Sequence, residues 1–312
     1  MMVKFLSVLS IVLQYLAVPD GYQFVHDTEP VRKYSFEDFD VEVLLQRNGP
    51  DTWQRVIMAF PKDVGDELCP AVVVPFYFPE AMLGFDPETG DVEEGYRGIE
   101  MMLHLVRRGF VCISAESYHL TYCPESDKDR RDFSRWEDAA DALMDDYPQW
   151  CGIGKLVADT ELLVDLLEAD PRVDDDRIGI AGHSLGGKTA FYTGCTDPRI
   201  KVILASDFGL LWEQTNWDDP WYWGARLGDL ESAGFCNVDL WIYSGYRPFF
   251  LIAGKYDDDA SCRALERAAD GGPAWASDHL GFLNHASGHR PPEYALEAGY
   301  EFMEKYLSSG RK

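Results

Sequence analysis

Positive charge is scarce in this sequence. Its 312 residues include 28 lysines and arginines against 54 aspartates and glutamates, which gives a formal net charge of −26. Such a surface repels the phosphates of nucleic acids and the headgroups of anionic membranes. We therefore expect no nucleic acid among the partners of this protein.

Paired cysteines are also missing. The seven cysteines are scattered, and none forms a Cys-x-x-Cys motif or a cysteine–histidine spacing typical of metal sites. An odd number of dispersed thiols is typical of a reducing compartment. We expect free thiols, no metal or organic cofactor, and a cytoplasmic location.

No apolar run has the length of a membrane-spanning helix. The most hydrophobic segment, residues 5–18, is too short and is interrupted by Gln14. It follows Lys4 as a signal peptide would, but Tyr15 stands where a cut after Ala17 requires a small residue. We expect residues 1–38 to be a helix docked on the surface and a lead-in, with secretion through an atypical signal as the alternative.

From residue 39 onward, short apolar runs alternate with segments of helical spacing. Strands are predicted at 41–45, 55–60, 71–76, 110–114, 177–181, 201–205, 248–253 and 280–284. Helices are predicted at 98–108, 136–143, 155–168, 185–193, 262–269 and 292–307. This order predicts one α/β domain over residues 39–312, with a mostly parallel eight-stranded sheet covered by helices on both faces.

Residues 209–246 interrupt this alternation. The segment has little regular pattern but holds five of the nine tryptophans. A long insertion between two strands is typical of a cap or of binding loops. We therefore expect an aromatic-rich cap insertion, in which Trp217 and Trp221 contact a substrate.

The strongest chemical signal is the run Gly182-His183-Ser184-Leu185-Gly186. It follows a predicted strand and opens a predicted helix, so Ser184 sits on a tight turn that projects its hydroxyl above the sheet. The helix N-terminus supplies oriented N–H groups for a developing oxyanion, and the N–H of Leu185 is the expected first donor. A second donor is expected from the loop after the third strand. No HGGG-type signature is present there, and Tyr77 is our candidate.

A serine nucleophile needs a base, and the base needs an orienting carboxylate. His289 lies on a loop after the last predicted strand and just before the final helix, so it is the expected base. Asp257 follows the strand 248–253 with Gly-x-x-Asp spacing and is the expected acid. Asp207, at the end of the preceding strand, is the alternative acid.

The nucleophile region resembles a known superfamily. Residues 177–190, with the flanking segments 170–173 and 197–201 and the run 288–292, are similar to dienelactone-hydrolase-like and acetyl-xylan-esterase-like α/β-hydrolases. This resemblance implies the α/β-hydrolase fold and ester hydrolysis by a catalytic triad. A serine stands where dienelactone hydrolases have a cysteine, so a dienelactone substrate is in doubt.

One detail of the turn around Ser184 indicates a more specific group within this superfamily. The pattern Gly182-x-Ser184-x-x-Gly187-Lys188 is similar to that of glucuronoyl esterases. The similarity implies that Lys188 helps to hold sugar hydroxyls and that the acid can follow the next strand, as Asp207 does.

The sequence thus predicts a serine esterase that acts through an acyl-enzyme on a small-molecule or sugar ester. A serine peptidase of the same fold, or a non-catalytic binding protein of this fold, is the alternative. Oligomeric state is not indicated by any of these features.

Overall fold

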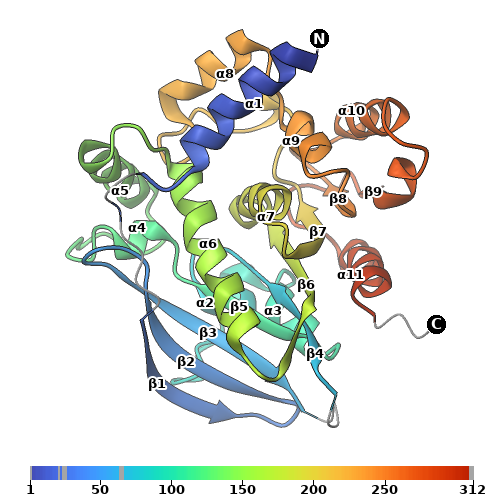
Figure 1. The fold of residues 1–312 in the computed structure, drawn as a ribbon. Coiled ribbons are helices and arrows are strands. Elements are labelled where there is room, and N and C mark those ends of the chain that lie inside the picture. The colour runs from blue at the N-terminus through green and yellow to red at the C-terminus, as the bar shows by residue number, and fades with distance from the viewer. Residues whose placement is uncertain (1, 20–21, 23–26, 63–66, 309–312) are drawn as a thin grey trace.

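One sheet of nine strands forms the centre of the computed structural model, which describes residues 2–19, 22, 27–62 and 67–308 (Figure 1). The strand order is β1-β2-β3-β5-β4-β6-β7-β8-β9. The strands are β1 (Thr28–Ser35), β2 (Phe39–Arg47), β3 (Trp53–Pro61), β4 (Cys69–Val73), β5 (Val111–Ala115), β6 (Val173–His183), β7 (Ile200–Ser206), β8 (Phe249–Ala253) and β9 (Leu280–Asn284).

All eight predicted strands are present, but the predicted number is wrong by one. The additional strand is β1, which pairs with β2 at the edge of the sheet. Seven of its eight residues are exposed and it contains Pro30, so it lacks the apolar alternation that indicates a strand. The prediction of a mostly parallel sheet is confirmed, because β4 to β9 are parallel while β1, β2 and β3 join through antiparallel pairs.

Helices cover both faces of the sheet. In the described part of the chain they are α1 (Met2–Leu16), α2 (Pro79–Leu83), α3 (Met101–Val106), α4 (Tyr118–Thr121), α5 (Phe133–Asp146), α6 (Gly152–Ala169), α7 (Leu185–Thr196), α8 (Leu227–Ala233), α9 (Asn237–Tyr243), α10 (Asp259–Asp270) and α11 (Glu293–Leu307). One face packs on α6 and α7, and the other on α3 and α11. The parallel strands are buried on both sides: in β4, Ala71 and Val73 enter one apolar cluster and Val72 enters the other.

The predicted N-terminal helix is present. It packs across α6 and α8 in an outer layer and buries Leu9, Val12 and Leu16 (Figure 1). The backbone carbonyl of Tyr15 accepts a hydrogen bond from the Cys151 thiol at 3.3 Å. Within the described residues, no helix is long and apolar enough to span a bilayer.

Candidate active site

Ser184 occupies the turn between β6 and α7. Its backbone has φ 57° and ψ −118°, a conformation that a non-glycine residue rarely adopts. Glycine is required on both sides. A Cβ at Gly182 would lie 2.1 Å from the Gly186 carbonyl oxygen, and a Cβ at Gly186 would lie 2.1 Å from that of Pro75. The sequence run around Ser184 therefore forms a tight strand–turn–helix of the kind predicted for a nucleophile elbow.

A hydrogen-bonded chain leads away from the Ser184 hydroxyl. His289 Nε2 lies 2.9 Å from Ser184 Oγ, and His289 Nδ1 lies 2.6 Å from Asp207 Oδ2. Since a carboxylate only accepts, Nδ1 carries the proton and Nε2 is free to accept from the serine. The three residues follow β6, β7 and β9, at the carboxyl ends of parallel strands. This arrangement can activate a serine oxygen by transfer of its proton to the imidazole.

Asp207 is held as an anion. Its Oδ1 accepts hydrogen bonds from four consecutive backbone N–H groups, at residues 254–257, at 2.8–3.1 Å. Burial raises the pKa of Asp207, but the hydrogen bonds from His289 and from the backbone outweigh burial, so the pKa is lowered overall. A charged carboxylate can stabilise the imidazolium that forms when His289 takes a proton.

The expected contact between Asp257 and His289 is absent, so on this point the prediction from spacing is wrong. The carboxylate of Asp257 instead accepts from the backbone N–H groups of residues 208–210 at 2.7–2.9 Å and from the Ser261 hydroxyl at 2.9 Å. The side chain of Asp257 is fully buried. Burial raises its pKa to about 6 against the opposing effect of those donors. The alternative acid, Asp207, occupies the place beside the imidazole.

His183 packs beside the base. Its ring lies 4.5 Å from the ring of His289, centroid to centroid, and its Nδ1 lies 3.1 Å from Ser206 Oγ. Burial lowers the pKa of His183 to about 3, helped by the positive charge that His289 can acquire. His183 is therefore a neutral packing partner at ordinary pH.

Ser184 and His289 open into a cavity of about 400 Å³. The other lining residues are aromatic or carry uncharged polar groups, with one lysine: Tyr77, Phe133, Lys188, Thr215, Asn216, Tyr222 and Tyr256. A volume of this size lies within the range of small-molecule binding sites.

Two backbone N–H groups, one next to Ser184 in the chain and one in the cavity lining, lack a hydrogen-bond acceptor among the described residues. Leu185 is the first residue of α7, so its N–H has no acceptor within the helix. Tyr77 belongs to the loop after β4, which meets the elbow where Pro75 contacts Gly186. Leu185 and Tyr77 are the two residues that the sequence predicted as oxyanion donors.

Lys188, which the resemblance implied to be a substrate-binding residue, lines the cavity one helical turn after Ser184. Its side chain is 3% exposed, and Nζ donates to Asn216 Oδ1 at 2.8 Å and to Thr215 Oγ1 at 3.4 Å. The ammonium lies 4.2 Å from the Tyr222 ring centroid and 4.7 Å from that of Trp217. Burial lowers the pKa of Lys188 to about 7, although Asp219, Asp257 and Asp218 at longer range oppose the shift.

The two tryptophans predicted to bind substrate do not line this cavity. Trp217 is fully buried and donates from Nε1 to the carbonyl oxygen of Gly209. Trp221 is 5% exposed and stacks on Phe133 with ring centroids 5.9 Å apart. Composition indicated an aromatic insertion but not which way its rings point. These two rings are packing residues, so their prediction as substrate contacts is wrong.

Several residues at the cavity were missed by sequence reasoning. Thr215, Asn216 and Tyr222 come from the predicted insertion, in which no sequence pattern distinguishes cavity-lining residues from the others. Phe133 starts α5, in a segment between β5 and α6 that was predicted only as a short helix. Tyr256 stands one residue before Asp257, and its ring lies edge-on to His289 at 4.8 Å.

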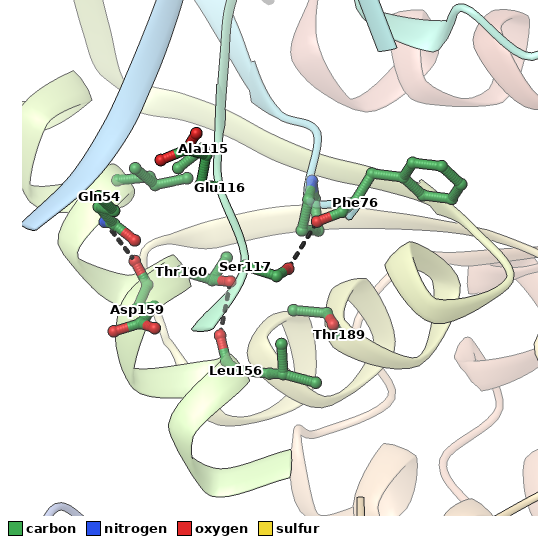
Figure 2. Close-up of a pocket in the computed structure, with 11 residues that line it drawn as sticks. Gln54, Phe76, Ala115, Glu116, Ser117, Leu156, Asp159, Thr160 and Thr189 are labelled. Carbon is green, nitrogen blue, oxygen red and sulfur yellow. Dashed lines mark hydrogen bonds between the residues drawn. The ribbon is translucent and has the colours of Figure 1, made fainter. Parts of the chain in front are cut away.

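A second, much smaller cavity of about 20 Å³ lies beside Phe76, in the loop after β4 (Figure 2). There the Ser117 hydroxyl donates to the carbonyl of Phe76 at 2.6 Å, and the Thr160 hydroxyl donates to Leu156 at 2.7 Å. The Ser117 bond fixes the residue next to Tyr77, so this region supports the loop rather than binding substrate.

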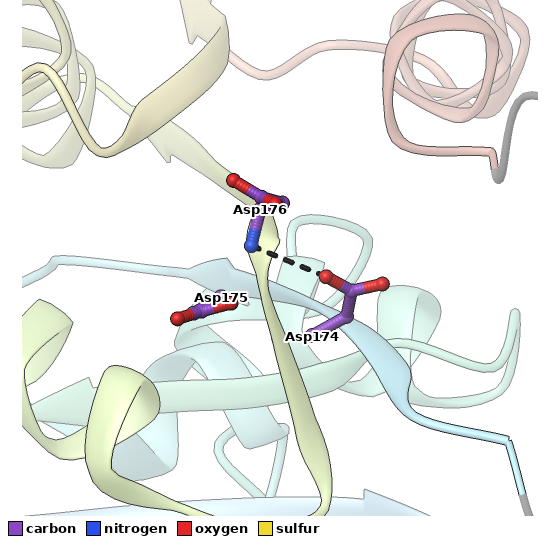
Figure 3. Close-up of side chains that lie close together, drawn as sticks. All are labelled: Asp174, Asp175 and Asp176. Carbon is purple, nitrogen blue, oxygen red and sulfur yellow. Dashed lines mark hydrogen bonds between the residues drawn. The ribbon is translucent and has the colours of Figure 1, made fainter.

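Three consecutive aspartates, Asp174, Asp175 and Asp176, have carboxylate oxygens within 4.8 Å of one another (Figure 3). Asp174 accepts from Arg177 Nε at 2.7 Å and from the Asp176 backbone N–H at 3.2 Å. The group lies at the start of β6, roughly 30 Å along the strand from Ser184 at 3.3 Å per residue. Asp175 and Asp176 are exposed and Asp174 is half-buried, and none of the three lines the candidate active site.

Sequence comparison finds one distant relative. No protein-family model matches the sequence. A Bacillus subtilis (strain 168) protein, YtaP, whose assignment as a hydrolase is provisional, is 25% identical over 191 residues. The match covers 57% of this chain and 61% of YtaP, so it spans less than two thirds of that relative.

The fold of this chain is similar to that of solved esterase structures. A glucuronoyl esterase from Solibacter usitatus matches with a TM-score of 0.68 over 97% of this chain and 92% of that chain, at 13% identity. A Bacteroides fragilis protein provisionally assigned as an acetyl xylan esterase matches with a TM-score of 0.67 over 90% of this chain and 74% of that chain, also at 13% identity. This chain has the α/β-hydrolase fold. The resemblance seen in the sequence is thereby confirmed at the level of fold. Within the α/β-hydrolase fold, the elbow and the loops after β7 and β9 lie at one edge of the sheet.

Proposed function

We propose that this protein is a serine hydrolase that cleaves carboxylic esters through an acyl-enzyme. The observation that carries the proposal is the hydrogen-bonded chain from Ser184 through His289 to Asp207, which opens into a cavity of about 400 Å³. The two structural neighbours, a glucuronoyl esterase and a protein provisionally assigned as an acetyl xylan esterase, support the same reaction class.

In the first step, His289 Nε2 takes the proton of Ser184 while Oγ attacks the ester carbonyl. The Asp207 carboxylate keeps the proton on Nδ1 and stabilises the imidazolium. The N–H groups of Leu185 and Tyr77 receive the oxyanion of the tetrahedral intermediate. His289 then gives its proton to the departing alkoxide, which leaves as the alcohol and produces the acyl-enzyme.

In the second step, water enters in place of the alcohol. His289 takes a proton from this water, and the hydroxide attacks the acyl carbon of the Ser184 ester. Collapse of the second tetrahedral intermediate releases the acid and returns the proton to Ser184 Oγ. The proton transfers use only Ser184, His289 and Asp207, which are already hydrogen-bonded to one another.

The cavity favours a small ester with a polar alcohol or acyl part. Lys188, Asn216 and Thr215 line one part of the wall and offer hydrogen bonds, while Tyr222 and Phe133 offer aromatic surface. Hydroxyl-bearing rings match such a mixture of polar and aromatic groups. We therefore propose acylated sugars as the substrate class to test first.

The test combines a covalent probe with a variant. A fluorophosphonate should label the wild-type protein at Ser184, and Ser184→Ala should lose both the label and about 10⁶ of kcat on 4-nitrophenyl acetate. Ser308→Ala, an exposed serine at the end of α11, is the matched control and should behave as wild type. Undiminished hydrolysis by purified Ser184→Ala would disprove the assignment of the nucleophile.

The two alternatives make different predictions in the same assay. A peptidase would hydrolyse a panel of peptide 4-nitroanilides faster than acetylated sugars. A non-catalytic binding protein would resist the fluorophosphonate, although the short contact between Ser184 and His289 gives that alternative little support.

A further inference from the structure

Two buried aspartates, Asp207 and Asp257, each accept hydrogen bonds from the backbone of the loop that contains the other. Asp207 Oδ1 accepts four backbone N–H groups from the loop that contains Asp257, and Asp257 accepts three from the turn that follows Asp207. The two loops follow neighbouring parallel strands, β7 and β8. The exchange is therefore reciprocal: each carboxylate fixes the backbone of the other.

The turn after β7 needs such support. Asp207 has φ 45°, in the left-handed region, and Gly209 has φ 77°. A non-glycine residue in this region is strained and persists only where its surroundings hold it. This conformation turns three successive N–H groups inward, toward one acceptor. That acceptor is the Asp257 carboxylate, in an arrangement typical of backbone anion-binding nests.

The direction of the Asp207 side chain follows from this turn. Oδ1 is occupied by the four N–H groups of residues 254–257, which leaves Oδ2 for His289 Nδ1 at 2.6 Å. If the backbone of this turn changed conformation, the Asp207 carboxylate would move away from the imidazole of His289. The contact between Asp207 and His289 thus depends on what keeps residues 207–210 in place.

We propose that Asp257 is a positioning residue, which holds the left-handed turn at residues 207–210 so that Asp207 reaches His289. The consequence for activity rests on the proposed function, in which Asp207 orients the base. Asp257 occupies the place at which sequence spacing expects the acid, but it acts through the backbone of the neighbouring loop. The Ser261 hydroxyl, which donates to Asp257 Oδ1, fixes the same carboxylate from α10.

The test is Asp257→Asn, with Asp258→Asn as the matched control. Asparagine keeps the size but turns an N–H₂ group toward backbone donors, so the turn should shift. Asp258 is exposed and accepts from the N–H of Ala260 at the start of α10, where asparagine serves equally well. Two properties are measured: ester turnover, and the strongly downfield proton resonance that a histidine N–H bonded to a carboxylate gives in NMR. Loss of this resonance in Asp207→Asn assigns it to His289.

We expect Asp257→Asn to lose about 10² of kcat with KM within about twofold, as a displacement of about 1 Å can cause. The His289 resonance should shift upfield or broaden, while Asp258→Asn matches wild type in both measurements. A folded Asp257→Asn with an unchanged resonance overturns the proposal, whether its kcat falls or not, because Asp207 would then hold its position without Asp257.

A second variant covers the case in which Asp257→Asn does not fold. Ser261→Ala removes only the hydroxyl donor of Asp257, so the His289 resonance should shift in the same direction by a smaller amount. An unchanged resonance in Ser261→Ala overturns the proposal. The resonance is read without substrate. If wild-type protein shows the resonance but hydrolyses no ester, the proposed function is refuted. The role of Asp257 in positioning Asp207 is still tested by the resonance in the variants.

Discussion

The buried lysine of the candidate site should make the protein less stable below neutral pH. Lys188 is 3% exposed and its direct acceptors, Asn216 and Thr215, are neutral. Burial lowers its pKa from the usual 10.5 to about 7. At about 1.36 kcal/mol per pH unit, that difference corresponds to a penalty on the order of 5 kcal/mol for the charged form in the folded protein.

The sign of the effect follows from proton counts. Below pH 7 both the folded and the unfolded chain carry the Lys188 proton, so the whole penalty is present. Between pH 7 and 10.5 the unfolded chain keeps the proton while the folded chain has lost it. The free energy of unfolding therefore rises with pH across this window.

Lys188→Met removes the titration and keeps an unbranched apolar side chain. A neutral hydrogen bond of about 1 kcal/mol is lost, so we expect the variant to be about 2–4 kcal/mol more stable than wild type at pH 6. That advantage should shrink by about 1.4 kcal/mol per pH unit above pH 7. Urea unfolding of both proteins from pH 5.5 to 9.5 measures the difference, since all other titrating groups are shared.

Lys305→Met is the control for that experiment, because Lys305 is exposed and its removal desolvates nothing. A difference between wild type and Lys188→Met that stays constant with pH would refute the reasoning. So would a Lys188→Met protein that is less stable than wild type at pH 6.

Three further predictions concern the site and its walls. Asp207→Asn should lose about 10⁴ in kcat, because the imidazole loses its orienting carboxylate, and a loss below tenfold in steady-state assays would contradict its assignment as the acid. Trp217→Ala should lower the free energy of unfolding by about 3–5 kcal/mol in urea titrations; a variant as stable as wild type would show that this ring is not packed as described. Phe133→Ala should raise KM for aromatic or sugar esters several-fold and leave kcat on 4-nitrophenyl acetate within about twofold, whereas an equal loss of kcat on every ester would argue against a role in substrate contact.

The sequence alone determined the nucleophile elbow. Ser184 lies between a strand and a helix that are contiguous in the chain, and the crowded turn demands glycine at positions 182 and 186, so local pattern was sufficient. His289 could be predicted for a similar reason, since it lies in the short loop between the last strand and the final helix. The alternation of apolar runs likewise located eight strands, because each central strand buries consecutive residues under helices on both faces.

Neither the edge strand β1 nor the direction of the tryptophan rings could be predicted from the sequence. β1 is held by its hydrogen bonds to β2 rather than by burial, and such pairing leaves no periodic mark on the residue types. An aromatic ring in an insertion can face a cavity or the core with the same composition. Trp217 faces the core because its N–H finds an acceptor there, the carbonyl of Gly209.

The choice between Asp207 and Asp257 belongs to the tertiary structure. Both follow neighbouring strands and both are aspartates, so spacing favoured the residue on the strand next to that of His289. The left-handed backbone at Asp207 turns its carboxylate toward the imidazole, and that conformation is held by hydrogen bonds to a loop about fifty residues later in the chain. Contacts between residues so far apart in the chain form only when β7 and β8 pair. The sequence pattern therefore left both aspartates as candidates, and only the tertiary structure distinguishes them.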